Sequence, residues 1–121
     1  MPGHILVVDD YFVTQRIMRQ ILEREGYQIS VASDGFEALE SIHAQSFDLV
    51  LLDMAMPRLD GMEVLAQLRA SEAYHDLPVI MLTASGDDGL RDTAKKTGAS
   101  AFLTKPSSST EVVAAVKSLL G

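Results

Sequence analysis

Five side chains of the kinds that bind metal ions and phosphoryl groups stand where short apolar segments of this chain end: Asp9, Asp10, Asp53, Thr83 and Lys105. Those segments run over 4–8, 49–52, 79–82 and 101–104. Their length and apolar character predict buried strands. Because ligands bind at the carboxyl ends of the strands in open parallel sheets, we expect the five side chains to meet in one crevice. Three carboxylates, a hydroxyl and an ammonium group together hold a divalent cation and a phosphoryl group.

Charge repulsion indicates that this crevice needs a cation. Two ionised carboxylates about 4 Å apart repel by roughly 4 kcal/mol at an effective dielectric constant near 20. Lys105 supplies one positive charge, and Mg²⁺ suits a site with few carboxylates and several water molecules. A single acidic residue such as Asp10 is more often a solvated turn or a helix cap, so the hypothesis depends on all five positions together.

The segments between the strands have the apolar spacing of helices. The face of the first helix is predicted at Val13, Ile17, Met18, Ile21 and Leu22. Gly26 then stands in a C-cap position. A second strand over 28–32 and the turn at Asp34-Gly35 precede a second helix, whose apolar residues are Phe36, Leu39 and Ile42.

Capping signatures predict where two later helices begin. Asp60 is followed three residues later by Glu63, and Ser108 is followed three residues later by Glu111. The segment from Gly86 to Gly98 is rich in glycine and has Leu90 as its one large apolar anchor, which predicts a short, loosely packed helix.

Strand and helix therefore alternate five times, which predicts an α/β domain with parallel strands joined by right-handed crossovers. The apolar character of strands 4–8, 49–52 and 79–82 indicates that helices cover both faces of the sheet. Strands 28–32 and 101–104 are more mixed and are predicted to lie at the edges. The order 2-1-3-4-5, a known doubly wound order that the chain matches, then places Asp9, Asp10 and Asp53 at the switch point.

Composition narrows the class of protein. A chain of 121 residues predicts one domain over 1–121. The net charge of −7 argues against direct nucleic-acid binding, which needs clustered Lys and Arg. The absence of cysteine fits a reducing compartment, so we expect a cytoplasmic location. No apolar stretch is long enough for a signal peptide or a membrane span.

Four motifs in a specific order carry a family resemblance: Val8-Asp9-Asp10, then Leu52-Asp53 to Pro57 with Asp60-Gly61 after it, then Leu82-Thr83-Ala84, and last Lys105-Pro106. Each is weak alone, but their joint order and spacing are specific. Over essentially its whole length the chain resembles the receiver domain of two-component response regulators. The resemblance implies a single (βα)5 domain of the flavodoxin-like, or CheY-like, class.

The resemblance also implies residue roles. Asp53 takes a phosphoryl group from the phosphohistidine of a sensor histidine kinase or of a histidine phosphotransfer protein. Lys105 and Thr83 each contact a phosphoryl oxygen. Mg²⁺ is held, partly through water, by Asp9, Asp10, Asp53 and the backbone carbonyl of Ala55. A downstream output domain or target protein receives the signal.

A switch is implied as well. Thr83 moves toward the phosphoryl group, Phe102 turns inward, and the surface of the fourth helix, fifth strand and fifth helix changes. Many relatives carry Tyr where this chain has Phe102, so inward packing alone would stabilise the active state here; a plain core aromatic is the alternative interpretation. The family has a cis bond between Lys105 and Pro106. The small residues Ala55 and Ser85 leave the lifetime of the acyl phosphate open.

Three other functions remain to be weighed. A phosphatase with an aspartate nucleophile needs a second aspartate two residues later, where Ala55 stands. The chain is thus not expected to be an enzyme beyond its own phosphorylation and slow dephosphorylation. An unphosphorylated pseudo-receiver, acting only as an interaction module, would have lost part of the acidic set, the Thr or the Lys. A flavin-binding relative needs a hydroxyl-rich and glycine-rich loop where the chain has Tyr11-Phe12-Val13.

Overall fold

The computed structural model describes residues 3–54, 56, 59–84, 88–105 and 108–120. The predictions for the backbone carbonyl of Ala55, for Ser85 and for the bond between Lys105 and Pro106 lie outside these residues. Among the described residues, no helix has the length and apolar character to cross a membrane.

Five strands and five helices alternate along the chain. In order they are β1 (His4–Val8), α1 (Phe12–Arg24), β2 (Gln28–Ala32), α2 (Gly35–Ala44), β3 (Leu49–Asp53), α3 (Gly61–Ala70), β4 (Val79–Thr83), α4 (Asp88–Thr97), β5 (Ala101–Thr104) and α5 (Ser109–Leu120). The strands form one parallel sheet in the order β2-β1-β3-β4-β5. The predicted fold class, strand order and edge strands are confirmed.

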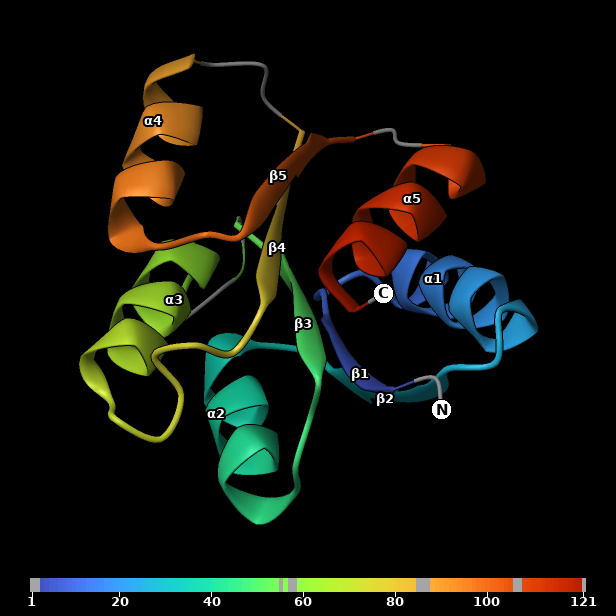
Figure 1. The fold of residues 1–121 in the computed structure, drawn as a ribbon, viewed down its shortest axis with the longest axis horizontal. Coiled ribbons are helices and arrows are strands. Elements are labelled where there is room, and N and C mark those ends of the chain that lie inside the picture. The colour runs from blue at the N-terminus through green and yellow to red at the C-terminus, as the bar shows by residue number, and fades with distance from the viewer. Residues whose placement is uncertain (1–2, 55, 57–58, 85–87, 106–107, 121) are drawn as a thin grey trace.

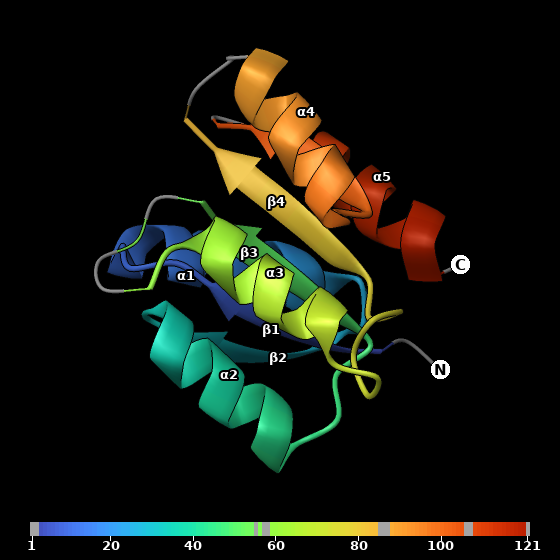
Figure 2. The same ribbon diagram turned by 90° about the vertical axis from the view of Figure 1, so that its left-hand side faces the viewer.

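The sheet lies between two layers of helices. Helices α1 and α5 cover one face, while α2, α3 and α4 cover the other (Figure 1; Figure 2). Alternate residues of β1 point to opposite faces of the sheet. Leu6 and Val8 pack toward α2 and α3, whereas Ile5 and Val7 pack toward α1 and α5. Strands β3 and β4 are buried along their whole length, which confirms that both faces are covered.

The predicted helix starts are confirmed by their hydrogen bonds. The side chain of Asp60 accepts from the backbone N–H of Glu63 at 3.0 Å. Ser108 and Glu111 form a reciprocal capping box, in which each backbone N–H donates to the other side chain at 3.1 Å. Helix α1 ends at Arg24, and Gly26 follows with a φ of 93°, a conformation that glycine adopts without strain.

Two predicted apolar faces, those of α1 and α2, are partly wrong. Val13, Ile17 and Phe36 are exposed. In α1 the buried residues are Gln15, Met18 and Leu22, which share one helix face. At 100° per residue Val13 points about 200° away from Gln15, so its side chain leaves the core.

Leu90 is also exposed and does not anchor α4. Among the residues of α4 whose burial is described, 89–97, the buried one is Ala94, which packs in the core cluster of the α2–α3–α4 layer. The two strands that carry Asp53 and Thr83 each extend one residue further than predicted, so both residues end a strand instead of following it.

Candidate functional site

The predicted site residues lie at the carboxyl edge of the sheet. Asp9 follows β1, Asp53 and Thr83 end β3 and β4, and Lys105 follows β5. Asp9, Asp53 and Thr83 are only 1%, 5% and 6% exposed, whereas Asp10 is exposed. Burying a polar side chain costs free energy unless it has a hydrogen-bond partner. The gathering of three such side chains at one edge of the sheet therefore indicates a functional site.

The structure brings three of the predicted carboxylates together. One oxygen each from Asp9, Asp10 and Asp53 lies within 4.8 Å of the others. Oxygen ligands at this spacing fit a hard divalent ion such as Mg²⁺, whose remaining positions are taken by water and substrate oxygens. The donor set therefore matches the cation that the sequence predicts.

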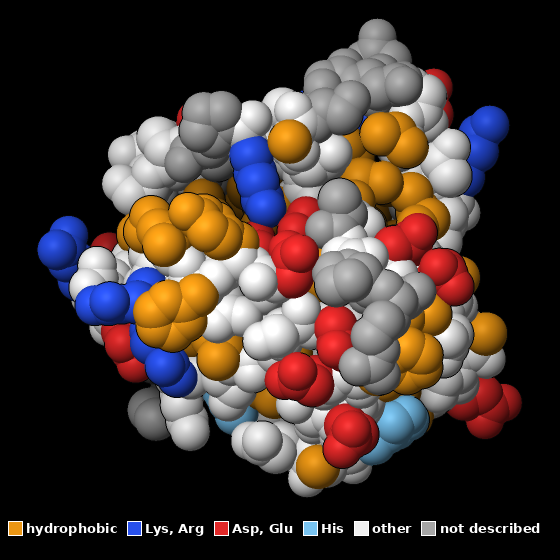
Figure 3. All heavy atoms as spheres, turned by 180° about the vertical axis from the view of Figure 1, so that it is seen from behind, with side chains coloured by type: hydrophobic (Ala, Val, Ile, Leu, Met, Phe, Trp, Pro, Cys, Tyr) orange, Lys and Arg blue, Asp and Glu red, His pale blue; other side chains and the backbone are white. Residues whose placement is uncertain are grey.

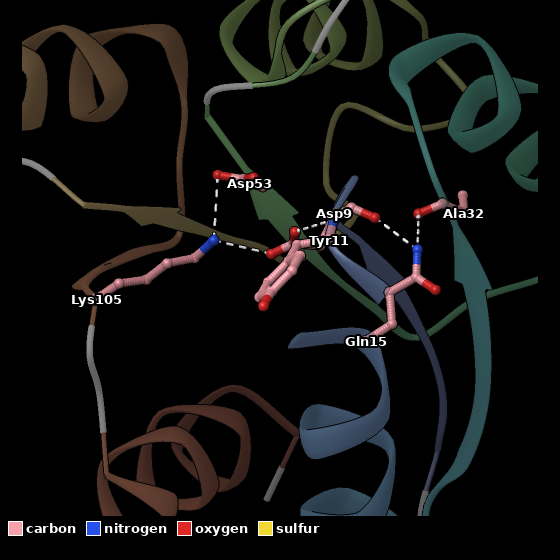
Figure 4. A network of polar contacts seen from close by, with 6 residues as sticks. All are labelled: Asp9, Tyr11, Gln15, Ala32, Asp53 and Lys105. Carbon is pink, nitrogen blue, oxygen red and sulfur yellow. Dashed lines mark hydrogen bonds and ion pairs between the residues drawn. The ribbon is translucent and has the colours of Figure 1, made fainter. Parts of the chain in front are cut away.

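Lys105 reaches from β5 to two of these carboxylates, as Figure 4 shows. Its Nζ lies 2.8 Å from Oδ2 of Asp9 and 3.5 Å from Oδ1 of Asp53. Burial by itself lowers the pKa of Lys105, but the hydrogen bond with Asp9 and the charges of Asp53 and Asp9 outweigh it, so this pKa lies above its ordinary value. The lysine therefore stays protonated through the neutral range, as a fixed countercharge must.

Both carboxylate oxygens of Asp9 are engaged. Oδ1 accepts the backbone N–H of Tyr11 at 2.8 Å, and Oδ2 accepts from Lys105. The bond with Tyr11 turns the chain from β1 into α1 and fixes the side-chain rotamer of Asp9. Asp9 is thus oriented before any cation or phosphoryl group arrives.

Gln15 is a residue that sequence reasoning missed. It is 7% exposed, and its Nε2 donates to the backbone oxygen of Asp9 at 2.6 Å (Figure 4). The available signal was a polar residue at 15 on the face that also carries Met18 and Leu22. That signal is weak, because the predicted face contains Met18 and Leu22 but extends toward Val13 and Ile17 and not toward Gln15.

Gly61 supports Asp53 from behind. A Cβ added at Gly61 would lie 2.2 Å from the backbone oxygen of Asp53, a distance that no side chain tolerates. The backbone N–H of Gly61 also donates to the oxygen of Met54 at 3.0 Å. The first residue of α3 therefore packs directly on the end of β3, and only glycine allows this approach.

The predicted switch residues lie on neighbouring strands. Thr83 and Thr104 are register partners on β4 and β5, and the backbone N–H of Lys105 donates to the oxygen of Thr83. Phe102 on β5 is half-buried, and the guanidinium of Arg91 on α4 lies 5.2 Å from its ring centre. Arg91 is a further residue that the sequence did not reveal.

Hydrophobic side chains gather close to the acidic ones on the face shown in Figure 3. The exposed hydrophobic residues of the described chain include Tyr11, Phe12, Val13 and Ile17. They begin directly after Asp10 and continue along α1. An apolar surface at the rim of a charged site is typical of a place where another protein docks.

Comparisons with known proteins agree with this geometry. The family model described as the response regulator receiver domain matches residues 5–117. The transcriptional regulatory protein ResD of Bacillus subtilis is 44% identical over 116 residues, which are 96% of this chain and 47% of ResD. The chemotaxis protein CheY4 of Vibrio cholerae has a TM-score of 0.92 at 27% identity, with 98% of this chain and 99% of that chain covered.

A third relative is the receiver domain of the sensor histidine kinase PA1611 from Pseudomonas aeruginosa. Its TM-score is 0.91 at 30% identity, and the match covers 100% of this chain and 99% of that chain. Its crystal structure has a magnesium ion coordinated in the active site cleft. The chain spans about half the length of the curated relatives that it matches, 47% of ResD and 48% of the protein SrrA of Staphylococcus aureus.

Proposed function

Because the chain belongs to the family of response regulator receiver domains, we propose that Asp53 is the phosphoacceptor of a two-component signalling system. Receiver domains of response regulators interact with sensor histidine kinases and bind Mg²⁺ at an acidic site. The observation that carries the proposal is the joint placement of Asp9, Asp10, Asp53 and Lys105 at one edge of the sheet.

The reaction is a transfer from nitrogen to oxygen. A carboxylate oxygen of Asp53 attacks the phosphorus of a phosphohistidine in line, the new oxygen–phosphorus bond forms, and the nitrogen–phosphorus bond breaks. The leaving histidine belongs to the kinase or to a histidine phosphotransfer protein. Positioning and charge neutralisation carry most of the catalysis of phosphoryl transfer, so the site needs no separate general base.

Asp9, Asp10 and Asp53 would hold Mg²⁺, with the backbone carbonyl of Ala55 as the further ligand that the family resemblance implies, and the bound ion would supply the positive charge that lets one anion approach another. Lys105 neutralises a second phosphoryl oxygen, which its protonated state supports. The hydroxyl of Thr83, at the buried end of β4, serves as donor to a third. Asp53 is thus both the nucleophile and the modified group, so the chain promotes its own phosphorylation and slow dephosphorylation and turns over no separate substrate.

The signal passes through the β4–α4–β5 region. When Thr83 moves toward the new phosphoryl group, the space that it leaves admits the ring of Phe102. In the present structure Arg91 lies over that ring, and a cation–π contact of this kind is worth about 0.5–1 kcal/mol at exposed sites. Inward movement of Phe102 breaks this contact, so the surface of α4 and β5 changes with the ring.

The partner that delivers the phosphoryl group must reach Asp53 across the rim of the site. The exposed residues Tyr11, Phe12 and Ile17 support docking of a phosphohistidine-bearing protein on α1. With seventeen acidic against ten basic residues, the net charge of −7 argues against direct nucleic-acid binding. We place the exchange in the cytoplasm, in line with a cysteine-free composition.

The second candidate is a pseudo-receiver that is never phosphorylated. The presence of the full acidic set, Thr83 and Lys105 argues against it.

The relatives' greater length supports an output domain or a separate target protein downstream, because about half of each relative lies outside the match.

Intact-mass spectrometry tests the proposal. The chain is incubated with Mg²⁺ and acetyl phosphate, and we expect a single added phosphoryl group that EDTA prevents. Asp53→Asn should remove the adduct, while the matched control Asp76→Asn, an exposed carboxylate remote from the site, should keep it. No adduct on the unaltered chain, or an undiminished adduct on Asp53→Asn, would show that the proposal is wrong.

A further inference from the structure

Gln15 is a buried polar residue for which the reaction gives no task. Among the described residues the buried polar and charged side chains are Asp9, Gln15, Asp53 and Thr83. Three of these are site residues, whereas Gln15 closes the first turn of α1 and faces the sheet. Burial of a carboxamide costs free energy unless its donors and acceptor are used, so its contacts indicate what it does.

The amide nitrogen of Gln15 lies among three acceptors. Nε2 is 2.6 Å from the backbone oxygen of Asp9, 3.3 Å from Oγ of Ser33 and 3.5 Å from the backbone oxygen of Ala32. Two of these acceptors are carbonyl oxygens, which cannot donate, so the group that faces them must be the NH₂ and not the side-chain oxygen. The orientation of the carboxamide is therefore set by its surroundings.

These contacts bind the end of β1 to the end of β2. The backbone N–H of Asp9 donates to the oxygen of Ala32 at 3.1 Å, and Gln15 holds the backbone oxygen of Asp9. That oxygen belongs to the planar peptide that joins Asp9 to Asp10. Holding it fixes the rotation of the peptide plane, and the plane in turn sets the direction in which the Cα of Asp10 leaves the strand.

Asp10 depends on this backbone more than Asp9 does. The carboxylate of Asp9 is held separately by Tyr11 and Lys105, whereas the side chain of Asp10 is exposed. The repulsion among three carboxylates would push an untethered Asp10 outward when no cation is bound. A rigid Asp9–Asp10 peptide keeps the three oxygens at the spacing that a cation needs.

We propose that Gln15 is the positioning residue of the cation site: by fixing the Asp9–Asp10 peptide it places the carboxylate of Asp10 and so sets the affinity for Mg²⁺. The inference rests on the proposed function for the identity of the cation. It concerns this chain's own hydrogen bonds and does not depend on phosphoryl transfer. Groups that orient metal ligands typically contribute 10- to 100-fold to affinity.

A Mg²⁺ titration of the full chain, followed by the backbone amide signals of Tyr11 and Met54 in NMR spectra, tests the proposal. Gln15→Met keeps the length of the side chain and removes the donor, and we expect it to weaken Mg²⁺ binding roughly tenfold. Val116→Ala, which removes buried volume in α5 far from the site, is the control: it should lower stability and leave Mg²⁺ affinity unchanged.

A double-mutant cycle with Asp10→Asn separates positioning from a general loss of structure. In the unaltered chain Asp10→Asn should weaken Mg²⁺ binding clearly, but in the Gln15→Met background it should add little, because Asp10 is already misplaced. If Asp10→Asn has the same effect in both backgrounds, or if Gln15→Met binds Mg²⁺ within twofold of the unaltered chain, the proposal is wrong.

Two further outcomes are decisive. Gln15→Glu keeps the volume and serves if Gln15→Met does not fold; if neither folds, Gln15 is a structural residue and the proposal is wrong. A chain that binds no Mg²⁺ in the millimolar range also overturns it. A chain that binds Mg²⁺ with the expected dependence on Gln15 but forms no phosphoryl adduct would refute the proposed function and leave this inference standing.

Discussion

The two halves of the sheet hold the site in different ways. On the side of β1, β2 and α1, the backbone N–H, the backbone oxygen and both carboxylate oxygens of Asp9 have hydrogen-bond partners. Helix α1 buries Gln15, Met18 and Leu22 against the sheet. On the side of α4 and β5, Ala94 is the buried residue among the described part of the helix, and every residue of β5 is only partly buried.

The difference indicates that the β1–β2–α1 side holds the groups for the chemistry, whereas the α4–β5 side provides the surface that changes. A site that must bring carboxylates, a cation and a phosphoryl group together needs fixed geometry, which dense hydrogen bonding provides. A surface that must change with modification needs an element whose alternative positions differ by a few kcal/mol, which sparse burial provides. Lys105 joins the two, because it follows β5 and binds the carboxylates of Asp9, directly after β1, and of Asp53, at the end of β3.

The largest effect is expected from Lys105→Ala, which removes that connection. Asp53 should still be phosphorylated, more slowly, because the cation site keeps its carboxylates. The α4–β5 region should no longer respond, because the phosphoryl group has lost its contact with β5. Hydrogen exchange of Asp88–Thr97 with and without acetyl phosphate measures this response. Lys96→Ala, at an exposed lysine of α4, is the control. If the exchange of α4 changes as much in Lys105→Ala as in the unaltered chain, Lys105 does not carry the signal to this region.

Replacing one glycine on each side of the molecule compares how tightly the two sides are packed. Gly61→Ala places a methyl group against the backbone oxygen of Asp53, and we expect the free energy of unfolding to fall by about 2–3 kcal/mol, as for an overpacked core. Gly89→Ala, at an exposed position in α4, should leave it unchanged or raise it by up to about 1 kcal/mol. Urea denaturation measures both. Equal losses at the two positions would contradict the difference in packing.

The smallest expected effect is that of Arg91→Ala. Loss of the contact over Phe102 should favour the inward ring by about 0.5–1 kcal/mol, a two- to fivefold shift in the equilibrium between the two surfaces. Phosphorylation by acetyl phosphate should become correspondingly faster. Arg16→Ala is the matched control, since Arg16 lies in the same way over Phe12 on α1, away from the switch. Identical rates for the two variants would show that Arg91 does not hold the ring.

The fold and the acidic cluster were predictable because each depends on a strong local signal. Apolar strands mark β1, β3 and β4, and parallel strand ends must meet, so the contact between Asp9 and Lys105, 96 residues apart, followed from topology. The capping box at Ser108 and Glu111 was likewise visible in the spacing.

What escaped prediction depends on how helices rotate against the sheet. Val13 and Ile17 have the composition of a core face, yet α1 turns Gln15 inward instead. The position of Arg91 over Phe102 depends on the packing of α4, which is set by the small residue Ala94 and not by the larger Leu90. In α1 the apolar residues form a wider stripe than the face that packs on the sheet, so their spacing alone does not fix the rotation of the helix.

Hydrogen–deuterium exchange of the full chain in Mg²⁺, with and without acetyl phosphate, tests whether phosphorylation of Asp53 changes α4 and β5 and leaves β1 and β2 as they are. We expect phosphorylation to change the exchange of α4 and β5, Asp88–Thr97 and Ala101–Thr104, while β1 and β2 keep theirs, and we expect Asp53→Asn to abolish the difference. Unchanged exchange in α4 on a chain shown by mass to be phosphorylated, or a change confined to β1 and β2, would contradict this expectation.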